Sequence, residues 1–435
     1  LALTSNDLVV RILSYPLWKL IHRLAYVAAI ALFIHRGFGT HDDMLGSTLA
    51  LFAPLLLLEI LRVLRQMYNF LAGLVHHMRA EHPAFEGVRK FRVTRKEAEC
   101  DDITSFYLEP VDGRKLKPFK PGQFLTYELE IPGHPEPVVR CYSLSDAPHP
   151  KHYRASIKRV PAPKDKPEVP PGLGSNFFHD HVNVGDLLNV RAPSGSFHLN
   201  PRGKNPVVLI GSGIGLTPVL SMLKAMADLG SKREVWFFYG VRNKGEAAMQ
   251  KEMEAAIARL PNGQLRICHS QPHKESVQGT DYHFNQRVTM DLLKEALPHN
   301  RYDFYFCGPG PMMQNLAEGF EAWGIPPARI HFEEFGPSTV KRRDATPGAA
   351  ASATIFFKRS GKKLLWDGRQ NSLLQFAESH GLKLRFGCRG GGCGTCKVRL
   401  LKGEILYPTP PGADPGPQYV LTCQGLPKGD LELDA

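Results

Sequence analysis

Four cysteines near the carboxyl end constrain this chain more than any other feature. Cys388, Cys393 and Cys396 follow the spacing C-x4-C-x2-C, and Cys423 comes from a separate, later segment. Three thiolates on one loop and a fourth from a distant segment are what a [2Fe–2S] cluster requires. The stretch 387–394 is rich in glycine, which lets backbone N–H groups approach the sulfur atoms and tune the reduction potential.

A zinc site is the alternative for the same cysteines. Zinc sites of this kind usually combine two C-x2-C units, whereas this sequence contains one. Eight cysteines in 435 residues are too few for a disulfide scaffold. We therefore predict a [2Fe–2S] cluster in a protein of a reducing compartment.

The segments that flank these cysteines, Ala353–Phe357 and Ser372–Ala377, resemble plant-type ferredoxins. The resemblance implies an α+β domain of the β-grasp type over residues 353–435, which follows a polar linker at 338–352. The domain has 12 Lys+Arg against 7 Asp+Glu, whereas plant-type ferredoxins are usually acidic. We expect a protein electron acceptor with an acidic surface, bound less tightly as salt rises; a solvated basic surface is the alternative.

Residues 90–200 alternate strand-like runs with Gly and Pro, and they contain the motif Arg140-Cys141-Tyr142-Ser143. Together with Gly172-Leu173-Gly174-Ser175, this motif resembles the flavin domain of the ferredoxin–NADP⁺ reductase superfamily. The resemblance implies an antiparallel β-barrel that binds FAD. Arg140 would neutralise the pyrophosphate, Tyr142 would stack on the isoalloxazine, and Ser143 would hydrogen-bond the flavin. Gly172, Gly174 and Ser175 would offer backbone N–H groups at a helix start.

Residues 204–337 alternate strands and helices, which predicts an α/β domain with a parallel sheet covered by helices. The loop Gly211-Ser212-Gly213-Ile214-Gly215-Leu216-Thr217 follows the apolar run Val207–Ile210. A strand, glycines and then a helix direct N–H groups at a nucleotide phosphate. Because Thr217-Pro218 replaces the third glycine of a G-x-G-x-x-G fingerprint, the loop resembles the superfamily's NAD(P)H loop instead. We expect Gly211, Gly213, Gly215 and Thr217 to bind the coenzyme, and helices over 217–229, 246–260 and 311–323.

Cys307 and Gly308 begin a second motif, which resembles the superfamily's other nicotinamide segment. The resemblance implies that Cys307 lies near the nicotinamide C4 and positions it for hydride transfer; a small buried hydrophobe is the alternative. Phe335 resembles the aromatic residue that covers the flavin and moves aside for nicotinamide. Arg242 and Ser270 end the second and third strands and are candidate contacts for the coenzyme ribose. Gln271 replaces the Arg of NADPH-selective relatives, so we predict NAD(P)H without a preference.

The order flavin, nicotinamide and cluster resembles phthalate dioxygenase reductase and phenylacetyl-CoA epoxidase reductase. It implies an enzyme, an NAD(P)H-dependent oxidoreductase that passes electrons through FAD and the cluster to a protein acceptor such as an oxygenase. One alternative is a ferric-reductase-like transmembrane haem enzyme. Another is a non-enzymatic electron-carrier subunit of a membrane complex. The net charge of +12 comes without a nucleic-acid motif, so no nucleic-acid partner is expected.

Residues 1–85 contain two uncharged apolar runs, at 24–34 and 44–58. Both are shorter than the roughly 20 residues that span a bilayer, unless their charged flanks reach the headgroups. We predict a helical membrane hairpin with both ends in the cytoplasm, because Lys and Arg are concentrated outside the short connection. The expected location is the cell inner membrane, with the reductase domains facing the cytoplasm.

His22 and His35 bracket the first run, and here the chain resembles the last two helices of ferric reductases and NADPH oxidases. The resemblance implies possible ligands for haem b. Thirteen residues at about 100° each leave the two side chains far apart around a regular helix, and the partner histidines of those families are absent. Two interfacial histidines are the alternative. Residue 1 is Leu and not an initiator Met, so we expect the natural chain to start upstream of Leu1.

Overall fold

A computed structural model of the chain describes residues 87–163, 168–336, 347–408 and 410–435. The chain divides into two compact units, and these residues belong to the second, Pro83–Ala435. The predicted membrane hairpin, with His22 and His35, lies outside the described residues, as does most of the linker. Within the described ranges, no helix has the length and apolar character needed to cross a membrane.

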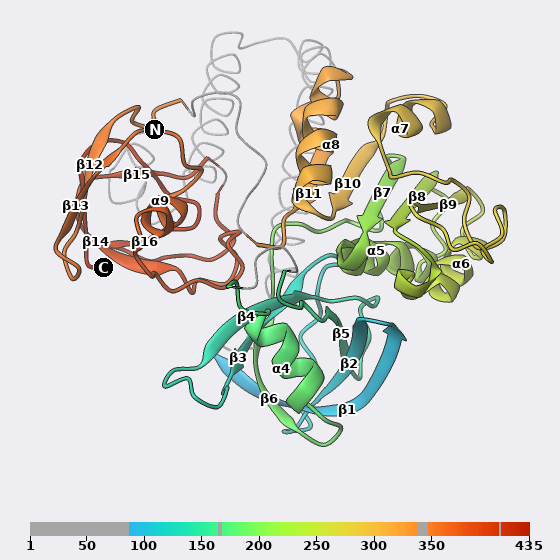
Figure 1. Cartoon of the computed structure of the whole chain (residues 1–435), viewed down its shortest axis with the longest axis horizontal. Helices are drawn as coiled ribbons and strands as arrows, with labels where there is room; N and C mark the ends of the chain where they lie inside the picture. Colours follow the sequence, from blue (N-terminus) through green and yellow to red (C-terminus); the bar gives the residue numbers. More distant parts are fainter. Residues whose placement is uncertain (1–86, 164–167, 337–346, 409) are drawn as a thin grey trace, which may run out of the picture. The chain divides into compact units, whose positions relative to one another are not determined.

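The first domain is a six-stranded antiparallel sheet in the order β4-β3-β6-β1-β2-β5, with the helix α4 (Figure 1). An isolated antiparallel bridge between Leu144 and Ala155 joins the chain after β4 to β5, so the two edges of the sheet meet, as the predicted barrel requires. The strands are β1 Val88–Cys100, β2 Ile103–Pro110, β3 Phe124–Leu129, β4 Val138–Ser143, β5 Tyr153–Lys158 and β6 Leu187–Ser194, and α4 is Leu173–His181.

An aromatic cluster anchors α4 on this sheet. Phe178 of α4 is fully buried and packs edge-on against Phe106 of β2, at 5.2 Å between ring centroids, and against Tyr127 of β3, at 5.2 Å. It also contacts Tyr142 of β4 at 5.3 Å. Because large aromatic rings contribute most to such cores, Phe178 fixes the start of α4 beside the edge strand that carries the flavin motif.

The second domain is a five-stranded parallel sheet in the order β11-β10-β7-β8-β9, as predicted. Residues 207–210 of its central strand β7 are all apolar, as expected for a strand with both faces buried. The strands are β7 Val207–Ser212, β8 Val235–Val241, β9 Gly263–His269, β10 Asp303–Cys307 and β11 Ile330–Glu333. The helices are α5 Leu216–Asp228, α6 Gln250–Ala258, α7 Met290–Ala296 and α8 Gly310–Ala322.

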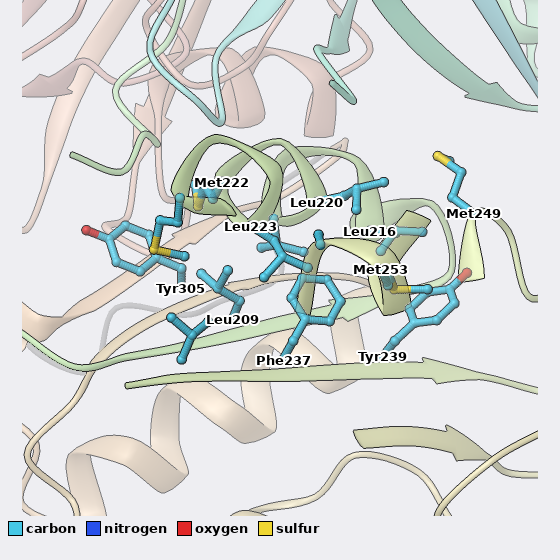
Figure 2. Close-up of a cluster of buried hydrophobic side chains, with 14 of the residues drawn as sticks. Leu209, Leu216, Leu220, Met222, Leu223, Phe237, Tyr239, Met249, Met253 and Tyr305 are labelled. Atoms are coloured by element: carbon cyan, nitrogen blue, oxygen red, sulfur yellow. The ribbon is translucent and has the colours of Figure 1, made fainter. Parts of the chain in front are cut away.

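Alternate residues of the central strands enter two different cores. Leu209 and Phe237 pack against α5 and α6, where Figure 2 shows them pointing toward Leu216 and Leu223. Their neighbours along β7 and β8, such as Ile210, pack into a second core with α7 and α8. The period of two along a strand therefore places helices on both faces of the sheet.

The helix predicted over 246–260 begins later than expected, because α6 starts at Gln250. Lys244–Glu246 forms a separate 3₁₀ turn, whose Gly245 N–H donates to the side chain of Asn243. Met249 has φ +53°, a left-handed conformation that interrupts the helix. The turn keeps Glu246 close to the end of β8.

The third domain has a five-stranded mixed sheet in the order β13-β12-β18-β14-β16 and one helix, the predicted α+β arrangement. Trp366, Phe357 and Phe376 of α9 form its buried core. Ser372 caps α9 by accepting a hydrogen bond from Gln375 N–H at 3.2 Å. The elements are β12 Ala353–Phe357, β13 Lys362–Trp366, α9 Leu373–Ser379, β14 Lys397–Lys402, β16 Tyr419–Leu421 and β18 Leu431–Leu433, with the small pair β15 Ile405–Leu406 and β17 Leu426–Pro427.

Candidate active site

The motifs predicted from the sequence converge on one cavity of about 460 Å³. Its walls come from all three domains: the flavin strand β4, the start of α4, the glycine loop before α5, the end of β11 and the loop that carries the first cluster cysteine. The lining residues include Arg140, Cys141, Tyr142, Ser143, Gly172, Gly174, Ser175, Ile214, Thr217, Glu333, Phe335, Phe386 and Cys388. The cavity therefore joins the predicted flavin residues to the nicotinamide residue Thr217 and to the cluster ligand Cys388, whereas Cys307, Arg242 and the other three cluster cysteines are not among its lining residues.

The start of α4 is shaped to receive an anion next to Arg140. No side chain caps this helix, so the N–H groups of its first turn are available. A Cβ on Gly174 would lie 2.7 Å from Arg140 Cγ and 3.0 Å from the Tyr142 hydroxyl, so only glycine fits here. A guanidinium beside free N–H groups suits the pyrophosphate of a dinucleotide.

Tyr142 forms an apolar wall of the cavity. Its ring packs edge-on against Tyr127, at 5.7 Å between centroids. Burial raises the pKa of its hydroxyl above the ordinary value, so the phenol stays neutral at physiological pH. A neutral aromatic surface of this kind suits the stacking of a flavin ring.

The two nicotinamide motifs cross at Gly215. A Cβ at this position would lie 2.2 Å from the Cys307 carbonyl oxygen and 2.7 Å from Gly308 N, which no side chain could tolerate. Gly213 has φ +52°, in the left-handed region that glycine adopts easily. Thr217 Oγ1 donates to the Ile214 carbonyl at 3.0 Å and so tightens the turn. The loop and the end of β10 thus form one continuous surface.

Cys307 ends β10 at the carboxyl edge of the parallel sheet, between Gly211 of β7 and Glu333 of β11. This edge is where α/β sheets bind nucleotides. The side chain is fully buried, and burial raises the pKa of its thiol, so it remains protonated. Cys307 is therefore suited to positioning and packing rather than to nucleophilic attack.

The predicted ribose contacts lie together at the ends of β8 and β9. Ser270 N–H donates to the Val241 carbonyl at 3.0 Å, and Gln271 N–H donates to the Arg242 carbonyl at 2.8 Å. The side chain of Arg242 is 64% exposed and forms an ion pair with Glu246. This acidic partner was not part of the prediction.

The four cluster cysteines approach one another as two pairs. The side chains of Cys388 and Cys393 interact, and so do those of Cys396 and Cys423. Within the described ranges, no three His, Cys, Asp or Glu side chains surround a single metal position. Four thiolates, three from one loop and one from a distant segment, are the ligands of a Cys₄ [2Fe–2S] cluster.

Backbone N–H groups surround the first pair of thiols, as the glycine-rich loop predicted. Cys388 Sγ accepts from Gly392 N–H at 3.2 Å and from Gly390 N–H at 3.4 Å. Cys393 Sγ accepts from Cys388 N–H at 3.2 Å. Such hydrogen bonds stabilise negative charge on sulfur and raise the reduction potential of a cluster. The residues present therefore fit a [2Fe–2S] cluster.

Comparisons with known proteins agree with this geometry. Three family models match in the order expected: an oxidoreductase FAD-binding domain at residues 90–199, an oxidoreductase NAD-binding domain at 209–318, and a 2Fe-2S iron-sulfur cluster binding domain at 355–428. The flavohemoprotein of Halalkalibacterium halodurans is 35% identical over 290 residues, which cover 64% of this chain and 69% of that protein. The chain belongs to the ferredoxin–NADP⁺ reductase superfamily.

This reductase also resembles solved structures. The FAD/NAD-binding domain of the nitric oxide dioxygenase from Vibrio cholerae O1 biovar El Tor is 32% identical, with a TM-score of 0.51, and the match covers 58% of this chain and 100% of that domain. An intact type IV self-sufficient cytochrome P450 monooxygenase matches 80% of this chain but 41% of its own length, at 23% identity and a TM-score of 0.54, which indicates a shared fold.

The reductase is an NAD(P)H-dependent flavin and iron–sulfur oxidoreductase, and its cofactors are FAD, NAD(P)H and a [2Fe–2S] cluster. Arg140, Tyr142 and the start of α4 would hold FAD, and Cys388, Cys393, Cys396 and Cys423 would hold the cluster. When bound, FAD accepts two electrons as a hydride and delivers them singly. Thr217 and the loop around Gly215 would shape the face on which the nicotinamide aligns, with Cys307 packed beneath the loop.

Sequence reasoning missed Glu333, which ends β11 and lines the cavity two residues before Phe335. Its Oε2 atom is inaccessible to solvent and has no hydrogen-bond partner, and the Ser143 hydroxyl is within hydrogen-bonding reach of the carboxyl group. Burial raises the pKa of Glu333 to about 8. A signal was available in the sequence, since Glu333 and Glu334 lie directly before Phe335, the aromatic residue predicted to cover the flavin.

Proposed function

We propose that this reductase passes electrons from NAD(P)H through FAD and the cluster to a separate protein acceptor, such as an oxygenase, at a membrane surface. The proposed electron path rests on the shared cavity, which is lined by Cys388 as well as by Tyr142 and Thr217. Since electron transfer slows steeply with distance, a cluster loop beside the flavin strand supports the cluster as the exit for electrons.

The chain's own residues contribute alignment rather than covalent chemistry. Gly215 and Cys307 bring the two nicotinamide segments into contact, and hydride transfer depends on such alignment. Phe335 is 46% exposed at the cavity, which suits a ring that moves aside when nicotinamide enters. Glu333, protonated at neutral pH and next to Ser143, can hold a proton beside the flavin site.

Anaerobic stopped-flow mixing with NADH and with NADPH tests this function. We expect rapid loss of flavin absorbance, followed by the electron paramagnetic resonance signal of a reduced [2Fe–2S] cluster. If neither coenzyme bleaches the flavin, the chain is an electron carrier and the reductase proposal is wrong. If the flavin is reduced but the cluster never is, the proposed electron path is wrong.

The acceptor is proposed to present an acidic surface to the third domain. Several of its basic residues already pair with acids: Lys358 with Glu432, Arg359 with Asp434, and Arg389 with Glu378. The following basic residues form no ion pair with a described residue: Lys362, Lys363, Lys383, Arg385, Lys397, Arg399 and Lys402. Electron-transfer rates to the acceptor should fall as salt rises, and rates that stay flat would contradict the proposal.

Membrane attachment is proposed for residues 15–66, on the basis of their sequence alone. Neither apolar run contains a charge, so a helix formed by either would lack the polar face of a water-exposed helix. The full chain should therefore sediment with membranes and need detergent for extraction, whereas a variant without residues 1–80 should not and should retain FAD. Full-length protein that stays in the supernatant without detergent would make this block an interaction module.

Haem binding by His22 and His35 is tested by the same detergent extract. A Soret band that disappears in His22→Ala would support the haem oxidoreductase alternative. An optical spectrum with flavin and iron–sulfur bands only would exclude it.

A further inference from the structure

A fifth cysteine, Cys141, lies beside the cluster ligands although it belongs to the flavin strand. It is the second residue of the motif Arg140–Ser143 on β4. Its side chain lines the same cavity as the ligand Cys388, and its Sγ lies 3.3 Å from Thr126 Oγ1 of the neighbouring strand. All eight cysteines of the chain lie in the described ranges, and the remaining three, Cys100, Cys268 and Cys307, lie in other surroundings.

Strand geometry explains why Cys141 faces the cluster loop. Successive side chains of a strand point to opposite faces. Arg140 and Tyr142 share the face toward Gly174 and α4, so Cys141 between them points to the other face. Val139 also lies on that face, and its Cγ1 is 3.3 Å from the position that a Cβ on Gly387 would take. One strand therefore contacts the flavin site on one side and the cluster loop on the other.

A second contact shows that the cluster loop is seated closely on the flavin domain. A Cβ on Gly392 would lie 3.1 Å from Phe124 Cζ and 3.3 Å from Gly195 Cα. At Gly392 the backbone of the loop therefore packs directly on β3 and on the chain after β6. The loop that carries Cys388 and Cys393 thus lies directly against the sheet that contains Cys141.

We propose that Cys141 is a positioning residue that donates an S–H hydrogen bond to a ligand thiolate, Cys388 or Cys393, and thereby raises the reduction potential of the cluster and holds its loop against the flavin strand. No bond at Cys141 forms or breaks, and its proton stays on sulfur while an electron passes from flavin to cluster. A donor to sulfur stabilises the added negative charge of the reduced cluster. The inference rests on the proposed electron path through the cluster.

The test is a dye-mediated redox titration of the full-length holoprotein, followed by the electron paramagnetic resonance signal of the reduced cluster. Cys141→Thr and Cys141→Val have nearly the same shape, but only Thr keeps a donor. We expect Val to shift the one-electron equilibrium with the dye toward the oxidised cluster by about threefold to tenfold, where tenfold corresponds to about 59 mV. Thr should stay at or above the wild-type potential. Cys100→Ala serves as a control because Cys100 contacts Asp102 instead.

Equal potentials for Val, Thr and wild type would overturn the proposal, as would potentials that follow side-chain volume. If the Cys141→Val variant does not retain the cluster, the Cys141→Ser variant tests the proposal instead. Its O–H is a stronger donor than S–H, so its potential should exceed that of the wild type, and an unchanged value would contradict the hydrogen bond. The titration uses no NAD(P)H, so failure of coenzyme oxidation and failure of this inference are separate results.

Discussion

Glu333 illustrates how burial changes the chemistry of a single residue. Its ordinary pKa is 4.5, and burial raises it to about 8, against the weaker effect of the hydrogen bond from Ser143. At neutral pH the folded protein therefore holds a proton that the unfolded chain has lost. The stability linked to this proton is fully present below about pH 4.5 and is lost as the pH rises toward 8.

We predict that Glu333→Gln removes this pH dependence, because Gln carries no titratable proton. Thermal unfolding of the holoprotein between about pH 5 and pH 9 should show wild-type stability falling with pH in this window and a flatter curve for the variant. Glu136→Gln, which changes an exposed side chain, is the matched control and should follow the wild type. A slope that is equal in Glu333→Gln and wild type would show that another group titrates.

A second prediction at the scale of single residues concerns Cys393 and the order in which electrons pass from flavin to cluster to acceptor. Cys393→Ser should abolish reduction of a one-electron protein acceptor, since one thiolate of the first pair is lost. NAD(P)H-dependent reduction of ferricyanide, which can draw on flavin directly, should largely survive. Both rates are measured by absorbance on the same sample, together with its FAD content. Equal loss of both activities with FAD retained would mean that the flavin does not act independently of the cluster.

Coenzyme selection belongs to the scale of elements, since it depends on where β8 and β9 end. The parallel pairing of these strands brings Arg242 next to Ser270 and Gln271. The 3₁₀ turn after β8 places Glu246 on the guanidinium of Arg242. A carboxylate at this place competes with a 2′-phosphate and tolerates a 2′-hydroxyl. If the coenzyme ribose binds here, as predicted from the sequence, we expect a preference for NADH.

We predict that Glu246→Gln raises the ratio of kcat/KM for NADPH to that for NADH by about two- to fivefold, in line with an exposed pair worth up to roughly 1 kcal/mol. Arg242→Gln should lower the same ratio. The ratios are measured by steady-state reduction of ferricyanide. The ratio should therefore rise in Glu246→Gln and fall in Arg242→Gln. If neither variant changes the ratio, the 2′-group of the coenzyme binds elsewhere.

At the scale of the whole molecule, a buried charge network ties the flavin domain to the nicotinamide domain. Arg154 of β5 is 1% exposed and donates to Glu252 of α6 at 2.6 Å and to the Ser145 carbonyl at 2.7 Å. Lys224 of α5 contacts Glu252 and Asp146, each at 2.5 Å. Charges removed from water must be paired, so these contacts hold the two domains in one orientation.

We predict that Arg154→Met destabilises the protein by about 1–3 kcal/mol, because Glu252 and the Ser145 carbonyl lose a hydrogen-bond donor while Lys224 still pairs with Glu252 and Asp146. Arg259→Ala, which breaks an exposed pair with Asp228, should cost about 1 kcal/mol or less. Urea unfolding of the holoprotein measures both. The double variant Arg154→Met/Glu252→Met should recover part of the loss, and an additive double variant would show that the two residues do not interact.

Local chemistry determined what could be predicted from the sequence. The glycine loop before α5, the Arg-x-Tyr-Ser strand and the cysteine spacing each depend on residues close together in the chain, so their patterns indicated phosphate, flavin and cluster sites directly. The apolar run at 207–210 predicted β7 because a strand buried on both faces must be apolar throughout. The order of the domains followed from the order of these motifs.

Only the tertiary structure decided which of these sites share a cavity and which other residues join them. Glu333, Cys141 and Arg154 have roles that arise from neighbours distant in sequence, and no local pattern specifies such neighbours. The pairing of Cys396 with Cys423, separate from Cys388 with Cys393, likewise depends on how β14 and β16 bring the two segments together. Spacing alone indicates four ligands, whereas only the packing of the chain brings the distant Cys423 beside the loop that carries the other three.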